Sequence, residues 1–164
     1  MSVGDVNGTE KGSGARFNDG KPDFSLIPLH VIAAAAEMAD LSEEQELVRR
    51  ALADLGLFQV SGNRDRLRDS LRWMNDCWRD CARVFEYGKK KYSAFNWARG
   101  MSWAVVLACA GRHALAYLEG EELDQESGLD HRGHFLCNLV MLYTFVDSYP
   151  QGNDLPDPKL FTPF

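Results

Sequence analysis

The chain has 164 residues, a length that favours one domain able to bury a real core. Its net charge is −6, so no general field attracts nucleic acid and we expect no nucleic-acid partner. The longest apolar run, residues 103–110, is too short to span a membrane, and the first residues lack an export signal. These properties predict a cytoplasmic protein with no membrane partner.

The four cysteines lie in apolar stretches with helical spacing and form no C-x-x-C pair, which disfavours a zinc site. Free cysteines are usually buried and behave as small hydrophobic residues. We therefore expect all four to be reduced, as suits a reducing cytosol.

The N-terminal part contains an arm, a turn and a first helix. Residues 1–15 are small and polar, which predicts a disordered arm. Residues 18–22 (Asn-Asp-Gly-Lys-Pro) carry strong turn chemistry. Pro28 then suits the start of a helix over about 29–39.

Two further helices are predicted in the middle of the chain. Ser42 opens a capping box before apolar residues at helical spacing, and Gly56 is placed to end that helix. Asn63 is suited to cap the next helix, over about 65–87, and Gly88 to stop it.

The C-terminal half predicts two central helices and an arm. Ser102 caps a helix over about 103–119 that is apolar almost all round and therefore belongs in the core. Asp130 caps a last helix over about 131–148, and prolines mark an extended arm over 150–164. No strand pattern stands out, so the predicted fold class is all-α.

The densest polar cluster follows the 103–119 helix. An acidic loop, 121–126, leads to His131 and His134, which share one helix face with Asn138. Clustered carboxylates beside two histidines suit a divalent cation that also holds phosphates. A solvated acidic loop beside structural histidines is the alternative interpretation.

Positive and aromatic side chains accompany this cluster. Arg112 and His113 lie in mid-helix among apolar residues, where a charged arginine needs a partner or a cleft. Lys91 ends a lysine run before Asn96 and Trp97, a combination that could hold a phosphate while an aromatic ring stacks on a base. Structural ion pairs, and lysines that complement a helix dipole, are the alternatives.

Three short blocks carry a family resemblance, and the chain has no Walker A loop, G-x-G-x-x-G, nucleophile elbow or H-E-x-x-H motif. The blocks are F-N-D-G-K-P at 17–22 with L-I-P at 26–28, Y-G-K-K-K-Y at 87–92 with N-W at 96–97, and R-H at 112–113 followed by G-E, D, E, G, H and H between 120 and 134. In this order and spacing they resemble the phage-rich family of dATP/dGTP diphosphohydrolases, whose members are related to the MazG-like all-α pyrophosphohydrolases.

The resemblance implies a MazG-like helical bundle, with one departure. The family passes from the first block to the second through one short helix, whereas residues 38–79 look inserted here. We therefore predict a single domain over 16–149 that contains a helical insertion at 38–79, between the N-terminal and C-terminal arms.

The resemblance also implies a metal-dependent hydrolase of dGTP, dATP or both, which releases the monophosphate and pyrophosphate. Some similar phage enzymes supply dGMP for 2-aminoadenine nucleotide synthesis, which would place the protein in the host cytosol. MazG-like relatives bind Mg²⁺ or Mn²⁺ and act as dimers or tetramers, so we expect a homo-oligomer. The alternatives are a metal phosphohydrolase that releases phosphate or triphosphate, and a non-catalytic nucleotide-binding oligomeric module.

Our site hypothesis assigns three roles. The metal ligands are Asp124, Glu126, His131 and His134, because the relatives' acidic pairs are missing and the two histidines stand near the second pair. The general base is Glu126 or Glu122. The substrate-binding residues are Lys21, Lys91, Asn96, Trp97, Arg112, His113 and Asn138.

Overall fold

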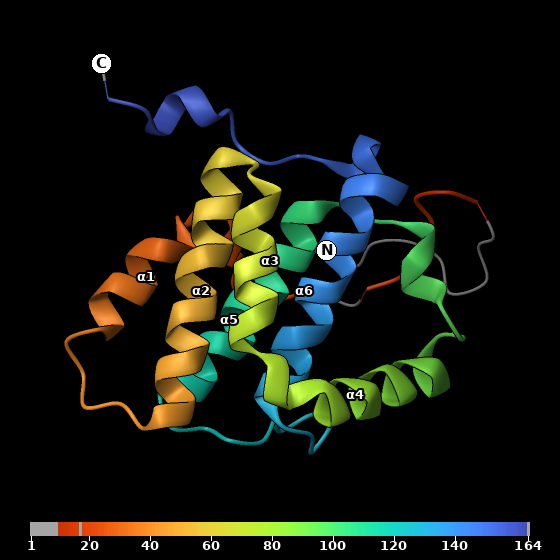
Figure 1. Cartoon of the computed structure of the whole chain (residues 1–164). Helices are drawn as coiled ribbons and strands as arrows, with labels where there is room; N and C mark the ends of the chain where they lie inside the picture. Colours follow the sequence, from red (N-terminus) through yellow and green to blue (C-terminus); the bar gives the residue numbers. More distant parts are fainter. Residues whose placement is uncertain (1–9, 17, 164) are drawn as a thin grey trace.

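The computed structural model describes residues 10–16 and 18–163, and these form helices joined by loops, with no strand (Figure 1). The α-helices are α1 (Leu29–Ala36), α2 (Glu43–Ser61), α3 (Arg64–Trp73), α4 (Trp78–Lys91), α5 (Trp103–Leu118) and α6 (His131–Ser148). The short 3-10 helices are η1 (Phe24–Leu26), η2 (Asn75–Cys77), η3 (Asn96–Arg99), η4 (Pro150–Gly152) and η5 (Pro158–Phe161). The predicted all-α fold class is confirmed.

The helices form a bundle with one member set crosswise. In Figure 1, α2, α3 and α6 stand side by side with α5 behind them, and α4 lies across their lower end. α5 packs against α6, and α6 in turn packs against α4. No helix among the described residues is long and apolar enough to cross a membrane.

The core is built mainly from α2, α5 and α6. Phe58, Leu107, Phe135 and Phe145 are fully buried, each contributed by one of these helices. Burial of such side chains stabilises a fold by about 1.5–3 kcal/mol each. The four cysteines are buried and free, as predicted, and act as part of this apolar interior.

The predicted caps form as expected. The Ser42 hydroxyl accepts a hydrogen bond from the Gln45 backbone, and the Gln45 side chain accepts one from the Ser42 backbone, which completes the capping box of α2. Asn63, Ser102 and Asp130 cap α3, α5 and α6 in the same way, through a side-chain oxygen. Each such cap is worth about 1 kcal/mol.

The single helix predicted over 65–87 is wrong, because the chain bends at η2 and forms α3 and α4. Asn and Asp side chains compete for the backbone and disfavour a helix interior, and the bend contains both. Buried Met74 fixes it to the core. α4 then runs on to Lys91, so Gly88 does not stop it as predicted.

Gly56, predicted to end a helix, lies inside α2 instead. α2 ends at Gly62, whose φ of 67° lies in the left-handed region that favours glycine. A Cβ added to Gly56 would lie 2.0 Å from the backbone nitrogen of His30. Gly56 therefore permits the close approach of α1 and α2.

The N-terminal arm is held more firmly than its composition suggests. The Gly12 amide donates to the Arg99 carbonyl at 2.7 Å, and the Gly14 amide donates to the Gly100 carbonyl at 2.9 Å. Residues 10–15, for which the composition predicts disorder, thus make backbone hydrogen bonds to the end of η3, because such bonds do not depend on side-chain type. Residues 1–9 lie outside the described residues.

The described part of the predicted C-terminal arm, residues 150–163, runs across the upper end of the bundle (Figure 1). Its Asp154 accepts a hydrogen bond from the Ala104 amide at 2.8 Å and another from the Ser102 hydroxyl. These contacts fasten the arm to the start of α5. Phe164 lies outside the described residues.

Candidate functional site

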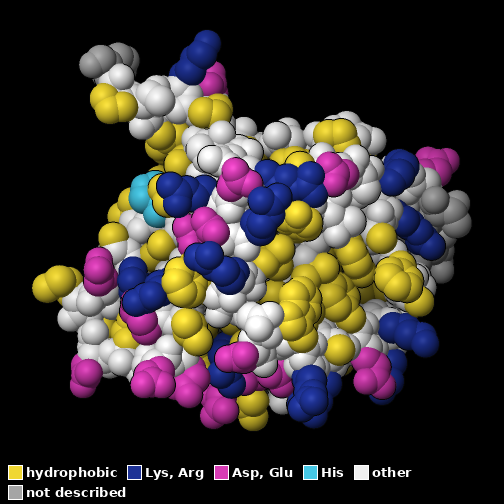
Figure 2. Space-filling model, viewed as in Figure 1, with side chains coloured by type: hydrophobic (Ala, Val, Ile, Leu, Met, Phe, Trp, Pro, Cys, Tyr) yellow, Lys and Arg dark blue, Asp and Glu magenta, His cyan; other side chains and the backbone are white. Residues whose placement is uncertain are grey.

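A pocket of about 630 Å³ brings the three sequence blocks together from distant parts of the chain. Its walls come from α4, α5, α6 and the segment around η3. The predicted site residues that line it are Lys21, Lys91, Asn96, Trp97, Arg112, His113, Asp124, Glu126 and His134. Figure 2 shows hydrophobic side chains gathered on the face above α4, with Lys and Arg side chains around them.

Three histidines cluster at the polar end of the pocket, and His113 and His134 line it. His113 Nδ1 and His131 Nδ1 are 2.8 Å apart, so one of them donates to the other. The rings of His113 and His134 stack with their centroids 4.3 Å apart. His131 Nε2 lies 3.1 Å from a carboxylate oxygen of Glu121. Helices α5 and α6 therefore place three imidazole groups next to one another.

The loop between α5 and α6 adds a carboxylate to this cluster. Asp124 Oδ2 accepts hydrogen bonds from the backbone amide and the hydroxyl of Ser127, both at 2.8 Å. Burial raises the pKa of Asp124, but these bonds and the charges of His134 and His113 lower it more, so it lies below its usual range. The Ser127 oxygen also lies 2.7 Å from His134 Nε2.

One group of side chains in this cluster has the composition of a metal site. His113, Asp124 and His131 each offer a ligand atom, and these atoms lie within 4.8 Å of one another. Two imidazoles and a carboxylate suit Mn²⁺ or Fe²⁺ better than Mg²⁺, which prefers oxygen ligands. His113, predicted as a substrate contact, thus joins two of the predicted ligands.

Glu126, predicted as a ligand and base, lies beside this group in an ion-pair network. One carboxylate oxygen is 3.3 Å from Lys21 Nζ and the other is 3.1 Å from Lys91 Nζ. The hydrogen bond from Lys91 and the charge of Lys21 lower the pKa of Glu126. The predicted roles of Glu126 stay predictions, and the structure shows it as the partner of two cations.

Arg112 ties the first sequence block to α5. Its guanidinium donates to the side-chain oxygen of Asn18 at 2.7 Å and to the carbonyl of Pro22 at 3.1 Å. These contacts hold Lys21 over the pocket, so Arg112 has a positioning role as well as a place in the lining.

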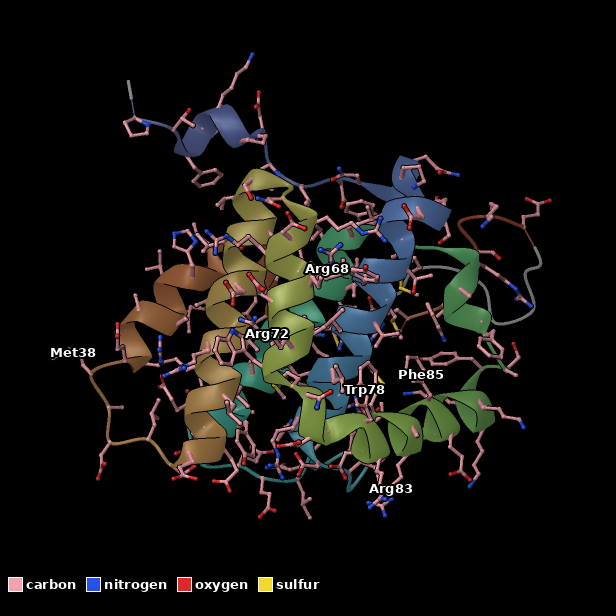
Figure 3. All side chains as sticks on the ribbon, in the orientation of Figure 1. Met38, Arg68, Arg72, Trp78, Arg83 and Phe85 are labelled. Carbon is pink, nitrogen blue, oxygen red and sulfur yellow. The ribbon has the colours of Figure 1, made fainter. Side chains whose placement is uncertain are left out.

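The other end of the pocket is aromatic. Trp97 packs against Phe85, with ring centroids 5.4 Å apart, and against Phe145 in the core. In Figure 3, Phe85 points from α4 toward the bundle, whereas Arg83 on the same helix points away from it. Phe95 also lines the pocket, and its φ of 56° is in the left-handed region, which a bulky residue rarely adopts. These rings form a surface on which a base can stack.

The remaining predicted residues do not line the pocket. Glu122 is exposed, and its part in the site is a backbone carbonyl that accepts from the His131 amide at 3.0 Å. Asn138 is buried behind the lining, where its amide donates to the His134 carbonyl at 2.7 Å. His131 is also buried, and it contacts the pocket lining through its hydrogen bond with His113.

Sequence reasoning missed Arg16, which enters the pocket beside Cys109. Burial raises the pKa of the Cys109 thiol, but the Arg16 charge and a hydrogen bond with His113 lower it more, to about 5. Arg16 stands alone in a polar stretch, so no periodicity marked it. Phe85 also lines the pocket, and its place there depends on the direction of α4.

We predict that acid destabilises the metal-free protein through His134. Burial and the charge of His113, opposed by Asp124, lower the pKa of His134 to about 4. The unfolded state would bind this proton near pH 6.5, so stability is lost as pH falls from about 6.5 to about 4 and levels off below. The loss is at most about 3 kcal/mol.

This loss is measured by urea unfolding in EDTA at several pH values. His134→Gln removes the group, so its unfolding free energy should fall less than that of the parent over the same range. Parallel curves for the two proteins would contradict the assignment.

A family model described as "dATP/dGTP diphosphohydrolase, N-terminal" matches residues 63–155, more than half of the chain. The match includes α3 to α6, Asp124 and the three histidines of the pocket, and it begins inside the segment predicted as an insertion. The insertion itself and the MazG-like relationship stay predictions.

One curated relative is similar over part of its length. A protein of Salmonella phage PMBT28, named dATP/dGTP diphosphohydrolase, is 29% identical to this chain over 75 residues. That stretch is 46% of this chain and 26% of the phage protein, and no solved structure matches the chain. The family match covers more than half of the chain and shows that the chain belongs to the dATP/dGTP diphosphohydrolase family.

Proposed function

We propose that the protein hydrolyses dGTP, dATP or both to the monophosphate and pyrophosphate, with the help of a divalent cation. The observation that carries this proposal is the polarity of the pocket. One end holds the imidazole and carboxylate groups with Lys21 and Lys91, and the other end holds Trp97 and Phe85. A triphosphate joined to a flat base has the same two-ended chemistry.

The donor set fits a cation. His113, Asp124 and His131 would hold it, with His134 and Ser127 supporting Asp124 from behind. A cation there would polarise the α-phosphate and lower the pKa of a bound water. Mn²⁺ fits the imidazoles better than Mg²⁺ does, although both were expected from the sequence.

The protein's own cations would bind the polyphosphate. Lys21 and Lys91 are partly exposed and aim at the same carboxylate, so phosphate oxygens can replace Glu126 as their partner. When the two lysines turn to the phosphates, Glu126 loses the interactions that lower its pKa. Glu126 then becomes a better proton acceptor and can serve as the general base.

The base would enter the aromatic end. Phe85 and Trp97 offer ring faces for stacking, and buried Asn96 offers a hydrogen bond. We also propose that the protein is a homo-oligomer, which the exposure of apolar residues on and before α1 supports. Leu26 is 80% exposed and Val31 is 52% exposed.

The test incubates the protein with dGTP, dATP, dCTP and dTTP, each with Mn²⁺, Mg²⁺ or EDTA, and separates products by anion-exchange chromatography. We expect metal-dependent dGMP or dAMP plus pyrophosphate. Release of phosphate or triphosphate would favour the other phosphohydrolase class. Nucleotide binding without any product would favour the non-catalytic module.

A further inference from the structure

The Arg16 guanidinium enters the pocket between α5 and α6, where its partners are two sulfur atoms and one amide oxygen. It donates to Cys109 Sγ at 3.1 Å, to the Asn138 side-chain oxygen at 3.1 Å and to Met141 Sδ at 3.0 Å. None of these contacts, within the described part of the chain, is with a carboxylate. These contacts use three of the five N–H groups of an arginine, so two make no hydrogen bond within the described residues. A ligand with a carbonyl oxygen or a ring nitrogen can accept from them.

The position of Arg16 separates it from the phosphate end. Cys109 lies four residues before His113 on α5, and Asn138 lies four residues after His134 on α6. Arg16 therefore contacts both helices about one turn, ~5.4 Å, away from the histidines. This shift is toward Asn96, because the amide of the neighbouring Ala15 donates to Asn96 Oδ1 at 2.8 Å.

Asn96 adds a second donor at the same place. Its side chain is 2% exposed and lines the pocket. Because Oδ1 accepts from Ala15, the orientation of the amide is fixed and Nδ2 is the free donor. Nδ2 is buried and finds no acceptor among the described residues. A buried donor without an acceptor is costly, so a ligand acceptor at this point would be well bound.

We propose that Arg16 and Asn96 read the O6 and N7 acceptors of guanine, so that the pocket prefers dGTP to dATP. This inference rests on the proposed function, since it assumes that a purine occupies the aromatic end. Guanine presents two acceptors, O6 and N7, on the edge that an arginine fork matches. Adenine presents an amino donor in place of O6. That amino group would face the N–H donors of Arg16, so neither the amino group nor the guanidinium would find an acceptor there.

The experiment measures binding, so that it does not depend on turnover. Calorimetry with Mn²⁺ compares dGMP, dAMP and deoxyinosine monophosphate, which keeps O6 and N7 and lacks the 2-amino group. For the unaltered protein we expect dGMP and deoxyinosine monophosphate to bind about tenfold more tightly than dAMP, or better. Arg16→Met should weaken the first two by about tenfold and change dAMP little.

Two further variants secure the interpretation. Arg16→Lys keeps the charge and loses the planar fork, so it should also lose the preference for guanine while the protein stays folded. Arg68→Met is the matched control, because Arg68 is 62% exposed on α3, pairs with Asp65 and is not among the pocket residues (Figure 3). It should leave all three affinities unchanged.

The outcomes separate this inference from the proposed function. Equal weakening of all three nucleotides in Arg16→Met and Arg16→Lys would overturn the inference, because it would place Arg16 at the phosphate. Deoxyinosine monophosphate that binds like dAMP would also overturn it. A guanine preference that both variants abolish, in a protein that hydrolyses no nucleotide, would support the inference and refute the proposed hydrolysis. Hydrolysis of dGTP and dATP with equal kcat/KM would support the proposed hydrolysis and refute the preference for guanine.

Discussion

Asp124→Asn is expected to lower nucleotide hydrolysis by at least about a thousandfold. Asp124 is the one carboxylate in the candidate metal group of the described residues, and its pKa below the usual range keeps it ionised at neutral pH. Cation catalysis of phosphoryl chemistry is worth several kcal/mol, and each 1.36 kcal/mol corresponds to a factor of ten in rate. Steady-state kinetics with dGTP and dATP, together with a calorimetric titration of Mn²⁺, measure the loss of turnover and of metal binding.

The matched control is Asp147→Asn. Asp147 forms an ion pair with Arg64 at 2.7 Å, but its side chain is 70% exposed and lies outside the pocket lining. Exposed pairs contribute little to stability, so this variant should keep its activity within about twofold. Full activity in Asp124→Asn, with the fold intact by circular dichroism, would rule out the assignment of Asp124 as a metal ligand.

Gly56→Ala is expected to destabilise the protein by about 3 kcal/mol or more. The added methyl group would lie 2.0 Å from the His30 backbone nitrogen, and backbone has no rotamer through which to move away. Relief requires α1 to separate from α2, which would open the contact around buried Leu29. For a chain of this size the midpoint of thermal unfolding should fall by about 6–12 °C, measured by calorimetry.

Gly88→Ala is the matched control for this prediction. Gly88 also lies inside a helix, α4, but no atom stands within 4 Å of the position of an added Cβ. Alanine there should stabilise the protein by about 0.5–1 kcal/mol, because it restricts the unfolded chain and favours helix. An equal change in both variants would show that helix propensity, rather than the approach of α1 to α2, governs Gly56.

Local chemistry made most of the helices predictable. Ser42, Asn63, Ser102 and Asp130 each satisfy orphan amides of the helix that follows them, and this interaction involves only neighbouring residues. The i, i+3 spacing of His131 and His134 likewise places them on one helix face independently of any tertiary contact. The acidic loop between two helices also marked the polar end of the site, because its carboxylates are neighbours in the chain.

The wrongly predicted helix ends share one cause, which is that they depend on contacts between residues far apart in the chain. Gly56 and Gly88 both look like helix stops, because a glycine at the end of an apolar stripe is the usual C-terminal signal. The structure distinguishes them only by what lies opposite: a neighbouring backbone for Gly56 and open space for Gly88. In the same way, no spacing predicts that the chain bends at η2 and turns α4 across the bundle.

The sequence by itself determined the all-α class, the capped starts of α2, α3, α5 and α6, and the free buried cysteines, because these depend on neighbours in the chain. Only the tertiary structure decided which residues meet. It placed His113 beside Asp124 and His131 and paired Glu126 with two lysines. It also left Glu122 exposed and brought Arg16 into the pocket lining. Such contacts join residues far apart in the chain, and their geometry follows from how the helices pack rather than from any local pattern.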